Sequence, residues 1–207
     1  MNPPENLRMS NSYLTKGRLE AFSDGVIAII ITIMVLEIHV PAGHDLPDLV
    51  AVLPTLFGYL LSFVFVGIYW NNHHHLLQAV HKVNGVILWA NLHLLFWLSL
   101  IPFGTSWMGH SGLRGGPIAF YGLVLFMAGF AYWLLAKALV ARHGQDSVLA
   151  RAIAGGLKEY VSLVSYLLGI VAAFFQPIAS LVLYVFVAVM WLVPDTRIER
   201  HLEDASR

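Results

Sequence analysis

The chain has 207 residues, of which 58% are hydrophobic and only 12% are charged, about half of the charged share of a typical soluble domain. Twelve basic and twelve acidic residues cancel, which argues against a nucleic-acid partner, because nucleic-acid binders carry a basic surface. The sequence has no cysteine, which excludes disulfides, thiolate metal sites and cysteine nucleophiles. A mean hydropathy of +0.71 is typical of an integral membrane protein, and we predict one transmembrane domain over residues 1–207.

The apolar segments predict an all-α fold with six transmembrane helices. A span needs about 20 apolar residues, and such runs cover residues 18–40, 49–70, 84–104 and 118–140. The last apolar stretch is too long for one span, and Gln176-Pro177 divides it, since proline disfavours a helix interior. We therefore expect short spans at 158–176 and 177–194, joined by a tight hairpin, with Val187 facing lipid.

The distribution of lysine and arginine predicts the orientation in the membrane. An even number of spans places both termini on one side of the bilayer. Of the 12 Lys and Arg residues, all except Arg114 lie on that side or at its boundary. Because cytoplasmic loops carry the excess of basic residues, we expect both termini in the cytoplasm and a multi-pass protein of the cell membrane.

Asp24 is an acidic residue inside the first span, about one and a half turns from its start. A charge within the membrane is costly and is usually paired. We expect Asp24 to pair with a cation or a histidine of a neighbouring helix, and to hold helices together near the inner boundary.

The first span also carries an apolar stripe with a single hydroxyl. At 100° per residue, six residues share one face, from which Asp24 points away: Phe22, Gly25, Ile29, Thr32, Ile33 and Leu36. Such a stripe is typical of helix packing. Packing is the more common meaning of such a stripe; the sharper interpretation is a pore lining in which bulky apolar rings gate by dewetting. Periodicity alone leaves both interpretations open.

Histidines gather after the second span, as His73-His74-His75 and His81. His74 and His81 are seven residues apart and can share a helix face, so a metal site is one interpretation. The other is a boundary anchor, which the lack of an acidic residue in that connection favours. The chain has no Gly-rich phosphate loop, no His-Glu-x-x-His helix and no Gly-x-Ser-x-Gly elbow. We therefore expect neither an enzyme nor a resident cofactor or metal.

One segment resembles a known family. Residues Arg18-Leu19-Glu20-Ala21-Phe22-Ser23-Asp24-Gly25, followed by Thr32, are similar to the hallmark of the transmembrane protein 175 family of endo-lysosomal potassium channels. That hallmark is an arginine, three residues, then Phe-Ser-Asp at the inner end of the first helix. The resemblance extends to Asn72-His73-His74, Asn91 and Ile101-Pro102-Phe103. It covers the first half of the chain well and the second half only through topology, and it points to a bacterial member.

The resemblance implies a passive, potassium-permeable cation channel in the bacterial inner membrane. Four identical six-helix subunits would surround a central pore lined by the first helix, with no carbonyl-type filter. Apolar rings of Ile29, Ile33 and Leu36 would narrow this pore, and Thr32 would contribute the preference for potassium. The first helix would be held to its neighbours by a set of residues at the inner end: Arg18, Phe22, Ser23, Asp24, His73 and His74.

Two alternatives from other functional classes stay open. One is a proton-coupled or cation secondary transporter, although carriers usually have broken helices and polar sites near the midplane. Five of the six predicted spans contain no Asp, Glu, Lys or Arg in their apolar part. The other, less favoured, is a metal-binding membrane protein built on the histidines.

Overall fold

The computed structural model describes residues 5–41, 43–80, 83–144 and 157–192, with side chains from Lys16 onward. Regular structure in these segments is helical throughout, which confirms the predicted all-α class for this part of the chain. The helices are α1 (Glu5–Leu36), α2 (Leu46–Gln78), α3 (Gly85–Ser99), α4 (Ile101–His110), α5 (Gly115–His143), α7 (Leu157–Ala172) and α8 (Pro177–Leu192).

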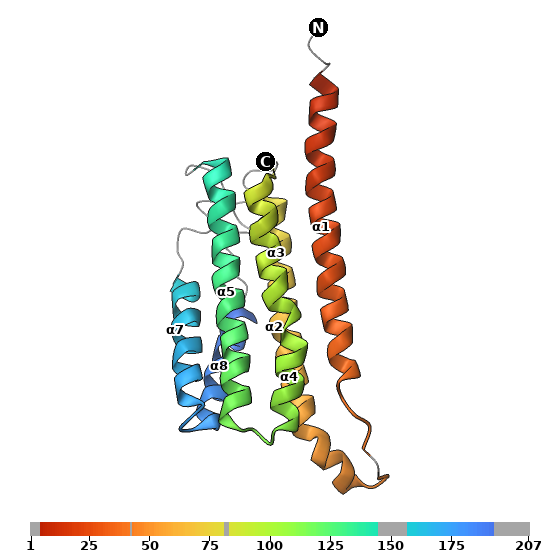
Figure 1. Cartoon of the computed structure of the whole chain (residues 1–207), viewed down its shortest axis with the longest axis vertical. Coiled ribbons are helices and arrows are strands. Elements are labelled where there is room, and N and C mark those ends of the chain that lie inside the picture. Colours follow the sequence, from red (N-terminus) through yellow and green to blue (C-terminus); the bar gives the residue numbers. More distant parts are fainter. Residues whose placement is uncertain (1–4, 42, 81–82, 145–156, 193–207) are drawn as a thin grey trace.

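The helices form a bundle in which successive segments alternate in direction (Figure 1). Helices α1, α3–α4 and α7 run one way, and α2, α5 and α8 run the other way. Helix α5 packs against α3, α4, α7 and α8 and therefore forms the centre of the subunit. Helix α1 contacts α2, α3 and α4 and stands at one edge of the bundle (Figure 1).

Helices α3 and α4 form one rod with a break at Leu100. Pro102 has no N–H to donate to the carbonyl of Leu98, so the ladder of hydrogen bonds is interrupted there. The ladder resumes where the N–H of Gly104 donates to the carbonyl of Leu100 at 3.0 Å. The rod extends from Gly85 to His110, beyond the apolar limit expected at residue 104.

Among the described residues, four segments are long and apolar enough to cross a membrane, as expected of a membrane protein: Lys16–Leu36, Leu46–Gln78, Gly85–His110 and Gly115–His143. Helices α7 and α8 have 16 residues each, about 24 Å at 1.5 Å per residue, against a hydrocarbon core of about 30 Å. Helix α8 begins at Pro177, the residue expected to divide the last apolar stretch. That α7 and α8 also cross the membrane stays a prediction.

The helix ends differ from the predicted span limits. Helix α1 ends at Leu36, so residues 37–40 lie beyond it. Helix α2 continues to Gln78, so His73-His74-His75 are helical rather than part of a connection. Hydropathy marks the apolar stretch of a helix, whereas the backbone hydrogen bonds continue into polar residues outside the hydrocarbon.

Val187 does not face lipid, contrary to the sequence-based expectation. Its side chain is fully buried, whereas Val185 and Val189 on the same helix are 45% and 55% exposed. One face of α8, with Ser180, Tyr184, Val187 and Ala188, packs against the bundle. Overall hydropathy does not distinguish the faces of α8; the signal in its sequence is that Ser180 and Tyr184, its polar residues, share the covered face with Val187.

Two glycines make room for Tyr184 at the junction of α5, α7 and α8. Tyr184 is fully buried, and its hydroxyl donates to the carbonyl of Ile118 at 3.4 Å. A Cβ added at Gly122 or Gly169 would collide with the Tyr184 ring or hydroxyl. The close approach of these helices therefore requires the absence of a side chain at both positions.

We expect Gly122→Ala to destabilise the subunit by about 1–3 kcal/mol, the usual range for overpacking. The matched control is Gly116→Ala on the same helix, where an added Cβ meets no atom within 4 Å. Thermal unfolding in detergent, followed by circular dichroism, should show a lower midpoint for Gly122→Ala alone. Equal midpoints for the two variants would contradict the packing described for Tyr184.

Candidate functional site

Helix α1 has one face that belongs to the subunit core. Its buried residues recur every three or four positions, the spacing of a single helix face. They contact the neighbouring helices α2, α3 and α4 and are at most 6% exposed: Leu19, Ser23, Ile27, Ile30 and Met34. This face attaches α1 to the rest of the subunit.

The stripe of residues predicted from the sequence lies on the other side of α1. Phe22 is 54% exposed, Ile29 58%, Ile33 42% and Leu36 79%, and Gly25 and Thr32 are exposed as well. Packing inside one subunit therefore does not account for the stripe. Its apolar side chains are available to lipid or to another subunit.

Thr32 places a single hydroxyl on this exposed apolar face. Its Oγ1 donates to the carbonyl oxygen of Ile29 at 2.9 Å. The hydroxyl proton is thus used within the helix, and the oxygen keeps a lone pair free to accept. A cation passing along the stripe would meet this oxygen as an acceptor.

A chain of buried hydrogen bonds holds α1 to α3 and α2. The Ser23 hydroxyl donates to the carbonyl of Leu19 at 2.8 Å and accepts from Nδ2 of Asn91 at 2.9 Å. The Asn91 Oδ1 accepts from Nε2 of His73 at 2.7 Å. All three side chains are at most 1% exposed. Buried polar chains of this kind, when fully paired, favour one packing arrangement of the helices they join.

Asp24 is held by a neutral donor rather than by the cation or histidine expected from the sequence. The indole Nε1 of Trp70 donates to Asp24 Oδ1 at 3.0 Å. The Trp70 ring stacks on His74, with centroids 5.8 Å apart and an interplanar angle of 19°. An indole N–H satisfies the carboxylate without burying a second charge, which is the less costly arrangement near a membrane.

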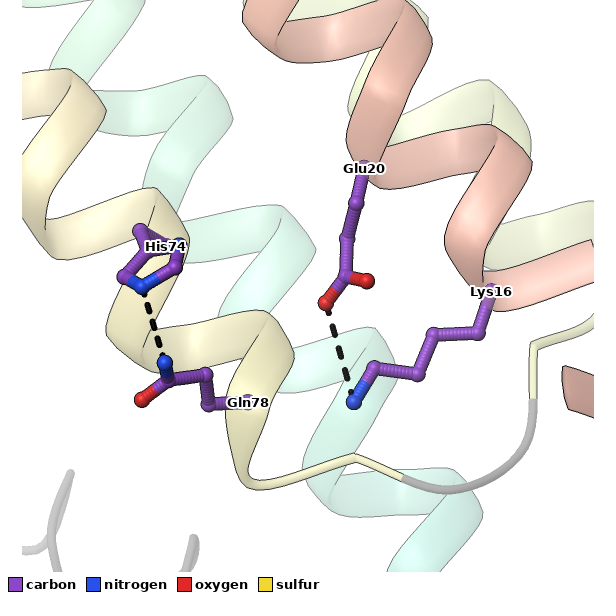
Figure 2. A network of polar contacts seen from close by, with 4 residues as sticks. All are labelled: Lys16, Glu20, His74 and Gln78. Carbon is purple, nitrogen blue, oxygen red and sulfur yellow. Dashed lines mark hydrogen bonds and ion pairs between the residues drawn. The ribbon is translucent and has the colours of Figure 1, made fainter.

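Polar contacts continue along α1 between Lys16 and Glu20 and at the C-terminal end of α2 (Figure 2). His74 is bonded to Gln78 one turn later, at 2.8 Å between His74 Nε2 and Gln78 Nε2. Lys16 and Glu20 form an ion pair at 3.6 Å on α1. Both pairs have the i,i+4 spacing and therefore support their own helices rather than joining the two helices.

Arg18 and Phe22 are exposed, unlike Ser23. Within the described part of the chain, the Arg18 side chain forms no ion pair and no hydrogen bond. That Arg18 and Phe22 help to hold helices together stays a prediction. For Arg18, such a role requires a contact with a group outside the described residues.

The histidines after the second span do not assemble into a metal centre in the described segments. No group of three or more His, Asp or Glu side chains there is placed to hold a metal ion. His73 is hydrogen-bonded to Asn91, and His81 lies outside the described residues.

The sequence analysis did not assign Asn91 and Trp70 to the site. Asn91 could have been found from the sequence, because it is an amide inside an otherwise apolar span and such a group needs a buried hydrogen-bond partner.

Comparison with known proteins identifies the family of the chain. The sequence model of a family described as the endosomal/lysosomal potassium channel TMEM175 matches residues 18–102. A protein of Chryseobacterium sp. described as a potassium channel is 54% identical over 191 residues, which cover 92% of this chain and 100% of that protein. The chain belongs to the TMEM175 family.

Further TMEM175 relatives differ in how much they share with the chain. The crystal structure of a Chamaesiphon minutus homologue of the lysosomal potassium-selective channel TMEM175 superposes on this chain with a TM-score of 0.73 at 25% identity. The superposition covers 86% of this chain and 97% of that one. The human relative, described as an endosomal/lysosomal proton channel TMEM175, is 37% identical over 101 residues, which are 43% of this chain and 20% of that protein.

We expect Asn91→Ala to lower stability more than the loss of one amide suggests. The variant leaves His73 Nε2 without its partner in a buried site, at about 1–3 kcal/mol for an unsatisfied group. It also removes the donor to the Ser23 hydroxyl, which keeps its own bond to the carbonyl of Leu19. The matched control is Asn71→Ala, which removes an exposed amide on α2. Folded yield and thermal midpoint in detergent should fall for Asn91→Ala only. A midpoint unchanged in both variants would show that the chain of bonds does not anchor α1.

Proposed function

We propose that the protein is a potassium-permeable cation channel that conducts passively through a central pore formed by α1 of four identical subunits. The observation that carries this proposal is the exposed stripe on α1, opposite the face that attaches α1 to its own subunit. The choice of potassium rests on the relatives from Chryseobacterium and Chamaesiphon minutus, which are described as potassium channels. A bacterial inner membrane is the expected location, and no resident cofactor is required.

Four copies of the stripe would enclose the pore. Ile29 and Leu36 are seven residues apart, about 10.5 Å along the helix axis, and Ile33 lies between them. Their side chains would form apolar rings that exclude water when the pore is narrow. An ion would then pass only after losing part of its hydration shell.

Thr32 would supply a polar group between these apolar rings. It lies three residues after Ile29 and four before Leu36, and its oxygen has a free lone pair, as described above. Four such oxygens at one level could replace part of the hydration shell of a potassium ion. This arrangement would select among cations without a filter of backbone carbonyls.

The inner end of α1 would keep the stripe aimed at the pore axis. The bonds from Ser23 through Asn91 to His73, together with the bond from Trp70 to Asp24, join α1 to α2 and α3. A helix fixed in this way cannot rotate about its own axis without breaking buried hydrogen bonds. Arg18 and Phe22 are exposed at the same end and are free to contact a neighbouring subunit.

The alternative is a secondary transporter, which the break between α3 and α4 favours, since carriers use discontinuous helices at their binding sites. The break at Leu100 and Pro102 is not accompanied by an Asp, Glu, Lys or Arg residue on either helix. A coupled, saturable flux in vesicles would support the carrier, and a current carried by an ion gradient alone would support the channel.

The tetramer and its central helix are tested by cross-linking. We expect Ile29→Cys and Leu36→Cys to form covalent dimers and higher species with a short thiol-reactive cross-linker, because four stripes meet at the axis. The absence of native cysteine makes the background clean. The matched control is Val185→Cys, exposed on α8. Light scattering should give four times the 23.0 kDa chain mass. Cross-links at Val185 alone, or a different mass, would refute the arrangement.

Ion selectivity is tested in reconstituted bilayers with opposed potassium and sodium gradients and a separate pH gradient. We expect a reversal potential set by potassium in the wild type. Thr32→Val keeps the shape and removes the oxygen, and it should lower the potassium-to-sodium permeability ratio roughly twofold to tenfold, the worth of one hydrogen bond. Thr32→Ser, the control, should retain most of the ratio.

Two outcomes would change this interpretation. An unchanged ratio in Thr32→Val would remove Thr32 from the selecting groups. A reversal potential that follows the pH gradient instead would identify a proton channel, the description that the human relative carries.

A further inference from the structure

Helices α1 and α4 end at the same end of the molecule (Figure 1). The rings of two histidines, His39 and His110, are in contact there. A groove of about 880 Å³ lies between these elements, and its lining includes Ile33, Glu37, His39, Ser106 and His110. The imidazole rings of His39 and His110 have centroids 5.1 Å apart and stand at 90° to each other. They come from opposite sides of the groove, since His39 follows α1 and His110 is the last residue of α4.

Backbone carbonyls set the tautomer of both rings. Nδ1 of His39 lies 3.1 Å from the carbonyl oxygen of Glu37, and Nδ1 of His110 lies 2.8 Å from that of Ser106. A carbonyl oxygen only accepts hydrogen bonds, so each Nδ1 carries the proton. In a neutral imidazole, Nε2 is then the atom with the lone pair. Histidines that bind metals are usually held in this way, with the other ring nitrogen donating to a carbonyl.

The separation of the rings suits one shared metal ion. Two imidazoles bound to a tetrahedral Zn²⁺ at about 2.0–2.1 Å have their ring centroids about 5 Å apart. Neither Nε2 has a hydrogen-bond partner in the described residues. The groove is open, so water can reach the remaining coordination positions, and the Glu37 carboxylate lines the same groove.

We propose that His39 and His110 form a binding site for a divalent transition-metal ion, of which Zn²⁺ is the probe, with water completing the coordination. Imidazole ligands suit zinc, copper and nickel rather than magnesium or calcium. The site differs from the histidines after the second span, which suggested a metal in the sequence, and it departs from the expectation that the chain binds none. Bound metal connects the end of α1 to α4.

Calorimetry on the full-length protein in detergent tests the binding. We expect saturable binding of one Zn²⁺ per subunit, and a loss of affinity of at least about tenfold in both His39→Ala and His110→Ala, since each removes one of two protein ligands. The matched control is His44→Ala, an exposed histidine of the same connection that does not line the groove. Absence of saturable binding, or an equal loss in His44→Ala, would overturn the proposal.

The effect on conduction rests on the proposed function and is measured separately. Ile29 and Ile33 of the stripe line the same groove, so a metal that fixes the end of α1 should reduce the current when Zn²⁺ is added on that side. We expect this inhibition to weaken at least about tenfold in the His39→Ala, His110→Ala double variant. Inhibition that is equal in wild type and double variant would overturn the link between this site and the pore. A silent wild type would count against the proposed channel, whereas calorimetry still decides whether the metal site exists.

Discussion

The arrangement of the whole subunit depends on how polar side chains are satisfied where water is scarce. The hydrogen bonds from Ser23 through Asn91 to His73 cross three helices with at most 1% exposure. Because an unpaired polar group in such a place is costly, α1 has only one rotation about its axis that satisfies all three residues. That rotation buries Ile27 and Ile30 and leaves Ile29 and Thr32 on the outside.

A second chain of hydroxyls acts on the other side of the bundle. Ser62 on α2 lies 2.6 Å from the hydroxyl oxygen of Thr105 on α4 and 2.8 Å from that of Tyr121 on α5. Together the two chains join α1, α2, α3, α4 and α5 with neutral hydrogen bonds. On α1, Lys16 and Glu20 pair with each other and Asp24 accepts an indole N–H. The subunit thus presents a rigid scaffold on which the exposed stripe of α1 is displayed.

The scaffold also explains why the middle of α1 and the segment that follows it differ. Buried hydrogen bonds at Ser23 anchor the middle of α1, whereas Glu37 and His39, which follow the helix, line an open groove. Close to the end of α1, Ile30 and Met34 pack against the neighbouring helices. A ligand in the groove, such as a metal ion shared by His39 and His110, would act on the segment that follows α1.

Local features of the sequence determined the helices themselves: their apolar length, the division at Pro177, and a period of 3.6 residues that gathers Ile29, Thr32 and Leu36 on one face. The hallmark around Phe22, Ser23 and Asp24 led to the family. Tertiary structure alone decided which helix faces are covered, so that the α1 stripe is exposed, Val187 is buried and Asp24 meets Trp70. The reason is physical: lipid and a protein core are equally apolar, so hydropathy records that a residue avoids water and not which apolar surface it contacts.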